Sequence, residues 1–516
     1  MIRQVSQQEV NDILWRACDT FRGTLDAADY KDYILVMLFL KYISDVWRDH
    51  FEQYKKQYGD DEERIRRRLH RERFILPYVE IKDGDEVVDR FLADYYNLYD
   101  RRETPNLGEL INIALERLEM ANKTKLTNVF RNIDFNSESR LGNTKKRNHI
   151  LQHLLLDFAD PRLDLRPSRI GNLDVIGNAY EYLIGKFAAG AGKKAGEYYT
   201  PPEVSTLIAK LVAPKPGERI CDPTCGSGSL LLKCVQEVGS DNYSLYGQEA
   251  ISGTWSLCVM NMFLHNVNSA RIEWADTLLE PKLIENDELM TFDVVVANPP
   301  FSLDKWGADN AGEEARSYNR WQRGVPPKSK ADYAFISHMI ETMSDQDSRM
   351  GIVVPHGVLF RGGAEGKIRK ALIKENRLDA VIALPSNLFF GTGIPTAVLI
   401  FRQDRGMRSS VLFIDASREY EDGKNQNSIR VDVEVKKIVE TYRAYQAVKK
   451  YACLVNVTDL LEEECNLNVS RYVDSYEEEC DVDLGAVLKY IHNLEDELDE
   501  VKDKMADTIA GLELDL

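Results

Sequence analysis

The feature that most constrains the fold is a short apolar run that two prolines end. Residues 291–301 read TFDVVVANPPF, and residues 292–297 are almost all apolar or β-branched. Such a run is typical of a buried strand in a parallel sheet. Proline has no backbone N–H and keeps the residue before it extended, so the strand should end at Asn298. We therefore expect Asn298 at the carboxyl edge of an open α/β sheet, where ligands bind.

The residues that follow this strand suggest a specific ligand. Asn298, Pro299, Pro300 and Phe301 combine an amide, a stiff backbone and an aromatic ring. The amide oxygen and a nearby backbone carbonyl can both accept hydrogen bonds from an exocyclic NH2 group. The ring can stack on a flat heterocycle. The tetrapeptide thus indicates a clamp for a planar amine such as adenine, and taken alone it also fits a proline-rich turn.

A glycine-rich turn lies upstream of the clamp. Residues 218–232, ERICDPTCGSGSLLL, predict a strand, a turn and a helix. A P-loop would need Gly-Lys-Ser/Thr at the helix start, where this chain has Ser229-Leu230. The dinucleotide fingerprint would need a third glycine, and position 231 is Leu. A nucleoside-type ligand without a pyrophosphate fits better.

Acidic residues end the next two predicted strands. Residues 244–249, SLYGQE, end in Glu249, which is placed to accept hydrogen bonds from ribose hydroxyls. Residues 271–278, RIEWADTL, form a third strand with Asp276 near its end, suited to an adenine amino group. Together with Asp222 after the first strand and Asn298 after the fourth, four successive strands each end in a polar residue at the expected ligand edge. A purely structural sheet would not need this pattern.

The segment before the glycine-rich turn contains another predicted helix start with polar residues. Residues 172–189 predict an amphipathic helix, and residues 190–196, GAGKKAG, a flexible basic loop. The sequence EYYTPP then places Thr200 or a neighbour to cap a helix that begins near Pro201. The free N–H groups of that helix could bind an anionic ligand group. Further helices and strands alternate downstream, at residues 331–343, 350–355, 364–375, 378–384 and 396–401.

Composition limits the class of protein. The 516 residues suffice for two or three domains, with 44% hydrophobic and 29% charged residues. The N-terminus lacks the apolar core of a signal peptide and no run could span a bilayer, so we expect a cytoplasmic protein that meets no membrane. The eight cysteines are scattered. Cys221 and Cys225 have no neighbouring His or second cysteine pair, so we expect no metal site.

The charge pattern argues against unaided DNA binding. The formal net charge is −18, whereas proteins that grip DNA alone usually show a basic surface. Residues 64–73, RIRRRLHRER, are the most basic run, and they form either a solvated helix face or a patch that contacts phosphates. The polar loop at residues 303–329 could cover a substrate, lie along DNA or be a surface insertion.

The two ends of the chain are expected to be helical. Residues 1–160 carry apolar residues at helical spacing, and residues 34–46 look like the central helix of a bundle. From residue 484 to residue 512 a coiled-coil-like stripe runs through Leu484, Val487, Ile491, Leu494, Leu498, Val501, Met505 and Leu512. Such a helix packs on a partner helix or on its own domain.

Together these motifs resemble a known family. The motifs DPTCGSGSLLL, GQE, ADTL and NPPF, preceded by GEYYTPPEV, resemble the modification subunits of type I restriction-modification systems. These are DNA adenine-N6 methyltransferases that use S-adenosylmethionine. Residues 14–45 and 384–401 look like further parts of the same family, so the resemblance covers most of the chain. It implies a Rossmann-like methyltransferase sheet with helices on both faces, after a helical N-terminal domain and before a coiled-coil-like helix.

The resemblance also implies a set of site residues. Asn298, Pro299, Pro300 and Phe301 would hold a target adenine that has flipped out of the duplex. Asp276 would lie near the cofactor's adenine. The other residues expected to contact S-adenosylmethionine are Glu197, Tyr198, Tyr199, Thr200, Pro201, Pro202, Asp222, Gly226, Ser227, Gly228, Ser229 and Glu249.

The resemblance finally implies partners and a division of labour. A separate specificity subunit would read double-stranded DNA, two modification subunits would flank it, and a restriction subunit would complete the complex. We expect a helical domain at residues 1–160, a catalytic domain at residues 161–475 and a partner-binding tail at residues 476–516. A methyltransferase that acts alone on DNA or on a protein glutamine is the main alternative. A scaffold that binds S-adenosylmethionine without catalysis is another, and the Asn298 clamp argues against it.

Overall fold

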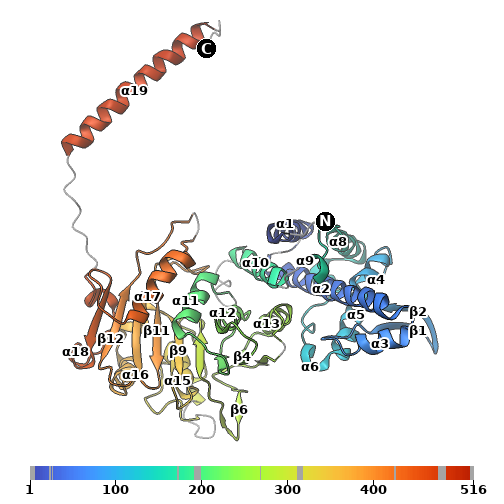
Figure 1. Ribbon diagram of the computed structural model, residues 1–516, viewed down its shortest axis with the longest axis horizontal. Coiled ribbons are helices and arrows are strands. Elements are labelled where there is room, and N and C mark those ends of the chain that lie inside the picture. The colour runs from blue at the N-terminus through green and yellow to red at the C-terminus, as the bar shows by residue number, and fades with distance from the viewer. Residues whose placement is uncertain are drawn as a thin grey trace. The chain divides into compact units, whose positions relative to one another are not determined.

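The chain forms two compact units in a computed structural model, Met1–Val473 and Asp474–Leu516. The structure describes residues 6–22, 25, 27–170, 174–190, 199–267, 269–310, 318–423, 426–474 and 484–511. The first unit holds the sheet and its surrounding helices, and the second holds helix α19, Leu484–Gly511 (Figure 1).

A mixed sheet forms the centre of the first unit. Within the described residues it has nine strands in the order β13-β12-β10-β11-β9-β8-β3-β4-β5. Neighbouring strands from β9 to β5 are all parallel, whereas β11 is antiparallel to both of its neighbours. The strands are β3 Arg219–Asp222, β4 Ser244–Glu249, β5 Arg271–Trp274, β8 Val294–Ala297, β9 Arg349–Pro355, β10 Leu378–Ala383, β11 Thr396–Arg402, β12 Ser410–Asp415 and β13 Ala452–Asn456.

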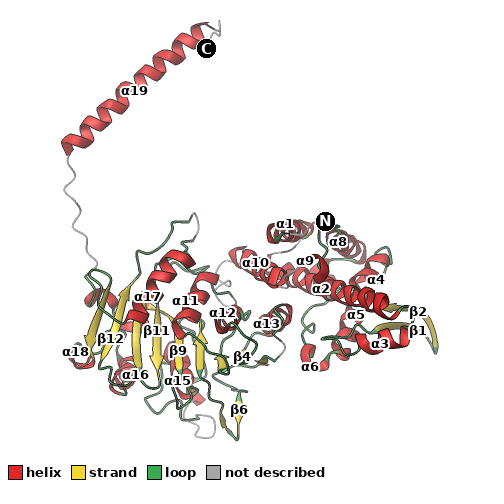
Figure 2. Cartoon of the chain, viewed as in Figure 1, coloured by secondary structure: helices red, strands yellow, loops and turns green. Residues whose placement is uncertain are grey.

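Helices cover both faces of this sheet (Figure 2). The side chains of strand β8 point alternately to the two faces of the sheet, and all four are buried. Both faces must therefore be covered. Val294 and Val296 belong to an apolar cluster with residues of α11 and α12, whereas Val295 and Ala297 belong to a second cluster with residues of α15 and α16. The helices are α10 Asp174–Gly190, α11 Pro202–Val212, α12 Ser229–Val238, α13 Ser252–Leu264, α15 Asp332–Glu341, α16 Gly363–Lys374, α17 Lys436–Ala444 and α18 Val457–Glu462. The expected Rossmann-like arrangement is confirmed.

Two predicted strands are shorter than expected. Strand β5 ends at Trp274, so Asp276 lies in the turn after it and not in the strand. Strand β8 begins at Val294, and Phe292 makes only an isolated bridge with Met343. The predicted strand at residues 244–249 matches β4 at both ends.

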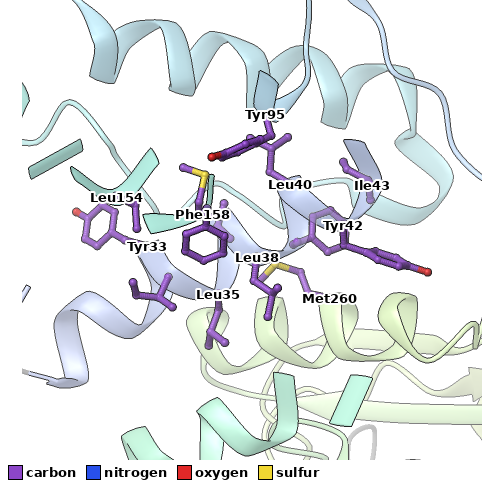
Figure 3. Packing of buried hydrophobic residues seen from close by; sticks show 14 of the residues in the cluster. Tyr33, Leu35, Leu38, Leu40, Tyr42, Ile43, Tyr95, Leu154, Phe158 and Met260 are labelled. Atoms are coloured by element: carbon purple, nitrogen blue, oxygen red, sulfur yellow. The ribbon is translucent and has the colours of Figure 1, made fainter. Parts of the chain in front are cut away.

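Helix α2, Ala27–Tyr58, is the central helix of the N-terminal part, as its apolar run predicts. Tyr33, Leu35 and Leu38 of α2 are fully buried, and Figure 3 shows them beside Phe158 and Met260. Met260 comes from α13, which follows strand β4 of the sheet. The N-terminal helices and the helix layer of the sheet therefore share one hydrophobic core.

A β-hairpin interrupts the otherwise helical N-terminal part. Strands β1 Tyr78–Asp83 and β2 Glu86–Leu92 pair antiparallel around Gly84, whose φ of +59° suits glycine. The rest of the N-terminal part is helical as expected, and the hairpin is an addition that the prediction did not include. The remaining helices are α1 Gln7–Ala17, α3 Glu62–Leu69, α4 Tyr95–Asp100, α5 Leu107–Ala121, α6 Lys123–Leu126, α7 Glu138–Leu141, α8 Thr144–Asp157 and α9 Pro167–Ile170.

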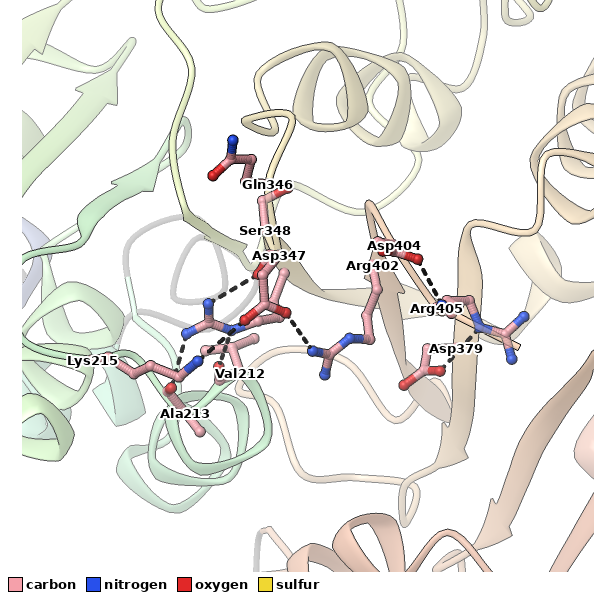
Figure 4. A network of polar contacts seen from close by, with 12 residues as sticks. Val212, Ala213, Lys215, Gln346, Asp347, Ser348, Asp379, Arg402, Asp404 and Arg405 are labelled. Carbon is pink, nitrogen blue, oxygen red and sulfur yellow. Dashed lines mark hydrogen bonds and ion pairs between the residues drawn. The ribbon is translucent and has the colours of Figure 1, made fainter. Parts of the chain in front are cut away.

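Ion pairs of Asp347, just before β9, connect this strand's amino end to Arg402 of β11 and to Lys215 (Figure 4). Asp347 accepts from Lys215 at 3.2 Å and from Arg402 at 2.9 Å. Deeper in the sheet, Arg405 Nε lies 3.0 Å from Asp379 Oδ1, and both side chains are fully buried. This second pair joins β10 to the loop after β11, so it stabilises the sheet on the side away from β5.

Candidate active site

The glycine-rich turn connects β3 to α12 at the carboxyl edge of the sheet. Asp222 ends β3, and its Oδ1 accepts a hydrogen bond from the Thr224 N–H at 2.9 Å. Gly226 and Gly228 have φ values of +54° and +83°. At Gly228 the positive φ favours glycine, and a Cβ would lie 2.4 Å from the terminal methyl of Met262, which would have to shift.

Glu249 links the end of β4 to this turn. Its Oε2 accepts from the Gly226 N–H at 3.0 Å, and its Oε1 accepts from the Ile251 N–H at 2.8 Å. Asp222 and Glu249 are only 2% and 7% exposed. Burial raises the pKa of each carboxyl group to about 7, because the charged form loses hydration. A cationic ligand beside these groups would favour their charged forms.

Asp276 shapes the turn after β5. Its Oδ1 accepts from the backbone N–H groups of Leu278 and Leu279, at 2.8 and 3.0 Å. The next residue, Thr277, donates from its hydroxyl to the Pro223 carbonyl at 2.5 Å. The turn that carries Asp276 is therefore bonded to the glycine-rich segment.

Arg320 holds the same turn from the other side. This side chain is 2% exposed, and its guanidinium donates to the carbonyls of Thr277 and Leu278, each at 3.1 Å. Arg320 belongs to the loop after the Asn298 clamp. The described part of that loop, residues 303–310 and 318–329, thus anchors the turn of Asp276, so the expectation of a mere surface insertion is wrong for this part.

The clamp lies at the end of β8. Asn298 Nδ2 donates to Thr200 Oγ1 at 3.0 Å, while Asn298 Oδ1 is buried and has no hydrogen-bond partner among the described atoms. The Phe301 ring meets the Phe389 ring edge to face, with centroids 5.6 Å apart. A buried acceptor without a donor costs about 1–3 kcal/mol, so the site is suited to a ligand that brings an N–H group.

Thr200 does not cap the helix that follows it. Helix α11 begins at Pro202 with Pro201 as its N-cap, and no side chain caps it. The Thr200 hydroxyl accepts from Asn298 instead. Of the two expected possibilities, the neighbour Pro201 is therefore the N-cap, and Thr200 contacts Asn298 in the site.

One small cavity brings many of the expected residues together. The expected residues that line it are Tyr199, Thr200, Asp222, Gly226, Ser227, Ser229 and Asn298. Thr224, Cys225 and Leu230 also line it. Glu249 reaches the cavity wall through Gly226, and Gly228 caps α12 beside it.

Other expected residues lie outside this lining. Pro201, Pro202, Pro299, Pro300 and Phe301 follow lining residues in the sequence but do not line the cavity, and Asp276 does not line it either. Glu197 and Tyr198 fall outside the residues that the structure describes.

Cys225 also lines the cavity, and its Sγ lies 3.8 Å from the Sγ of Cys258 in α13. Sequence reasoning missed two other contributors. Thr277 and Arg320 fix the turn of Asp276. No local pattern marks Arg320, because its partners lie more than forty positions upstream.

Comparisons with known proteins agree with this geometry. Residues 171–481 match the model of the N-6 DNA methylase family, and residues 10–158 match that of the HsdM N-terminal domain. The type I restriction enzyme MpnII methylase subunit of Mycoplasma pneumoniae is 32% identical over 99% of this chain and 98% of its own length. The MjaVIII methylase subunit of Methanocaldococcus jannaschii is 33% identical over 96% of this chain and 83% of its own.

A solved structure is similar over almost the same extent. The crystal structure of the methyltransferase subunit of a type I restriction-modification system from Streptococcus thermophilus is 34% identical, with a TM-score of 0.79. It covers 91% of this chain and all of its own. The sheet and the motifs at its carboxyl edge define a methyltransferase of the Rossmann-like class. The chain belongs to the N-6 DNA methylase family, among the methylase subunits of type I restriction enzymes. Its activity is that of an adenine-specific DNA methyltransferase.

Among the described residues, no helix has both the length and the apolar character needed to cross a membrane.

Proposed function

We propose that this subunit binds S-adenosylmethionine at the carboxyl edge of β3, β4 and β8 and methylates N6 of an adenine flipped out of double-stranded DNA. The observation that carries the proposal is the buried Asn298 Oδ1, which has no donor among the described atoms while Thr200 holds the other end of the amide. An exocyclic amino group is the donor that such an oxygen would take.

The residues around the cavity fit the cofactor. The turn at Gly226 to Ser229 would hold its amino-acid part, Glu249 its ribose and Asp276 its adenine. The two buried carboxyl groups, Asp222 and Glu249, are favourable neighbours for a positively charged ligand, since burial has left them easily protonated without one. Glu197, Tyr198, Tyr199, Pro201 and Pro202 complete the proposed cofactor contacts.

Methyl transfer would need no covalent enzyme intermediate. S-adenosylmethionine, when bound, would supply the electrophilic methyl group. Asn298 Oδ1 and the Pro299 carbonyl would accept hydrogen bonds from the two N–H groups of the adenine amino group. These bonds would localise the lone pair on the amino nitrogen. These hydrogen bonds strengthen as positive charge develops on N6, which stabilises the transition state. Pro300 would keep the backbone rigid, and Phe301 would stack on the base.

We further propose that sequence recognition lies in a separate specificity subunit. Two copies of this chain would flank one specificity subunit, and a restriction subunit would join for cleavage. The net charge of −18 supports this division, because the chain lacks the basic character of a protein that grips DNA alone. In this proposal residues 1–160 form a helical domain, residues 161–475 the catalytic domain and residues 476–516 the tail that binds the partner.

The tail has the surface that a partner helix requires. On α19 the apolar side chains of Leu488, Ile491, Leu494, Leu498, Val501 and Met505 are between 44% and 62% exposed. They recur at steps of three and four residues, which is coiled-coil spacing. A matching apolar face on the specificity subunit would cover them.

Transfer of a labelled methyl group tests the proposal. The full-length chain is incubated with labelled S-adenosylmethionine and unmodified host DNA, with and without the specificity protein. We expect label at adenine N6 only when both proteins are present. Label without the partner would show that this chain reads DNA itself, and no label with both present would refute the proposed activity.

A further inference from the structure

A second cavity lies away from the candidate active site, between the N-terminal helices and the sheet. It has a volume of about 350 Å³ and is lined by residues of α6, α13 and the start of β5. Binding pockets for small molecules start at roughly this size, about 300 Å³. Its position separates it from the active site: Arg271 and Ile272 stand at the amino end of β5, whereas Glu249 and Asn298 stand at the carboxyl ends of their strands.

The floor of this cavity is apolar. Trp255, Met262 and Phe263 of α13 line it and are buried, and Val259 and Ile272 complete the apolar wall. The Trp255 N–H is already bonded to the Ile272 carbonyl at 3.0 Å, so the indole offers the cavity a surface without a free donor. An apolar, flat part of a ligand could pack against these side chains.

The rim of the cavity is basic. Lys123, Lys125 and Arg271 line it together with the hydroxyls of Thr124 and Thr127, and among the described lining residues none is acidic. Glu273 stands nearby and pairs with Arg271 at 2.7 Å. Even with Glu273 counted, the rim has an excess of positive charge in a chain whose net charge is −18.

Further positive charge lies behind the rim. The Arg73 guanidinium stacks 4.0 Å from the centre of the Phe263 ring, and Lys125 Nζ donates to the Arg73 carbonyl at 2.8 Å. Burial and then the charge of Arg73 lower the pKa of Lys125. An anion bound in the cavity would attract the positive charge of Lys125. It would therefore raise the pKa of Lys125 and offset both effects.

We propose that this cavity binds a phosphorylated small molecule of about mononucleotide size. The phosphate would lie between Lys123 and Arg271, with the Thr124 hydroxyl as a further donor. The flat part would lie on Met262 and Phe263. This site is independent of the proposed cofactor site and shares no residue with it.

Equilibrium dialysis of the full-length chain with radiolabelled AMP tests the proposal. S-adenosylhomocysteine is present in excess, so that any AMP at the cofactor site is displaced. We expect saturable binding of AMP, with adenosine and inorganic phosphate each at least about tenfold weaker, since each probe lacks one half of the contacts. The affinity should fall as salt is raised.

A matched pair of charge reversals locates the site. The Lys123 side chain is exposed, so Lys123→Glu should fold normally and weaken AMP binding about tenfold or more. Lys145→Glu makes the same charge change on the exposed surface of α8 and should leave binding unchanged. Thr124→Ala gives a second, smaller test of the same rim.

Four outcomes would overturn the proposal. The first is no AMP binding at millimolar concentration, and the second is binding that Lys123→Glu leaves intact. The third is binding that is seen only when S-adenosylhomocysteine is left out, which would assign the binding to the cofactor site. The fourth is displacement of AMP by a short DNA duplex that depends on Lys123, which would assign the cavity to DNA phosphates.

Discussion

The side-chain amide of Asn298 donates a hydrogen bond to the hydroxyl of Thr200, with 3.0 Å between nitrogen and oxygen. This bond fixes which end of the amide is left for a ligand. Thr200→Val keeps the shape of the side chain and removes the acceptor, so the amide can rotate. We expect kcat for methyl transfer to fall about tenfold, the effect of one hydrogen bond. Thr200→Ser keeps the hydroxyl and should retain most of the activity; equal loss in both variants would contradict this role.

Asn298 itself should be far more important for turnover than for cofactor binding. Asn298→Ala removes an acceptor that would act on the transition state, so we expect kcat to fall about 100-fold or more. The dissociation constant for S-adenosylmethionine, measured by calorimetry, should change less than about threefold. A variant that keeps its activity would refute the assignment of the clamp.

Cofactor binding should release protons near neutral pH. Burial raises the pKa of Asp222 and Glu249 to about 7, and a positively charged ligand would lower both values again. The affinity should therefore decrease as the pH falls through 7. Calorimetry in buffers of different ionisation enthalpy measures the protons released. Cofactor binding to the Asp222→Asn variant should release fewer protons than binding to the wild type. An unchanged number of released protons would exclude Asp222 as their source.

The same two carboxyl groups should affect the stability of the ligand-free protein. Their unfolded-state pKa values are about 4, so between about pH 4 and pH 7 the native state binds more protons than the unfolded chain. Their contribution to the free energy of unfolding therefore decreases as the pH rises through this range. Saturating S-adenosylmethionine should lower the native-state pKa values of Asp222 and Glu249. The free energy of unfolding should then decrease less as the pH rises.

The buried pair of Asp379 and Arg405 should be a stability determinant without a role in catalysis. Tyr442 also donates to Asp379, at 2.8 Å, so the carboxylate is well bonded. Asp379→Asn leaves the buried guanidinium of Arg405 without its charge partner, and we expect a loss of about 3–5 kcal/mol. Denaturant unfolding measures it. The exposed pair of Lys502 and Asp499 is the control, because Asp499→Asn should cost less than about 1 kcal/mol.

Removal of the tail should separate assembly from cofactor binding. A chain that ends before Asp483 lacks α19, so it should no longer co-purify with the specificity subunit but should still bind S-adenosylmethionine. Leu498→Glu places a charge on the apolar stripe and should weaken the complex, whereas Lys489→Glu, on the opposite face of α19, should not. A truncated chain that still co-purifies would refute the proposed docking role.

The sheet could be predicted because its strands carry local signals. In β8 every residue is apolar and the prolines end the strand, so burial on both faces and the position of Asn298 follow from the sequence. Strand β4, with the sequence SLYGQE, is less apolar, yet its predicted bounds match the structure at both ends. The β1–β2 hairpin also has a local signal, the two-residue turn Gly84-Asp85.

Other features depend on contacts between distant residues. Thr200 meets Asn298 across 98 positions, and nothing near Thr200 in the sequence distinguishes this bond from a helix cap. Arg320 reads as a surface arginine until the fold brings it to the carbonyls of Thr277 and Leu278. Such contacts are set by the packing of whole elements, so sequence periodicity does not reveal them.

The exposed stripe of α19 has a consequence for the protein on its own. Leu494 and Leu498 are 46% and 53% exposed, and a helix with such a face also matches a second copy of itself. In a cell that makes this chain in excess, copies would compete with the intended partner for the same face. Balanced synthesis of the two chains would then determine how much functional enzyme forms, even where every active site is intact.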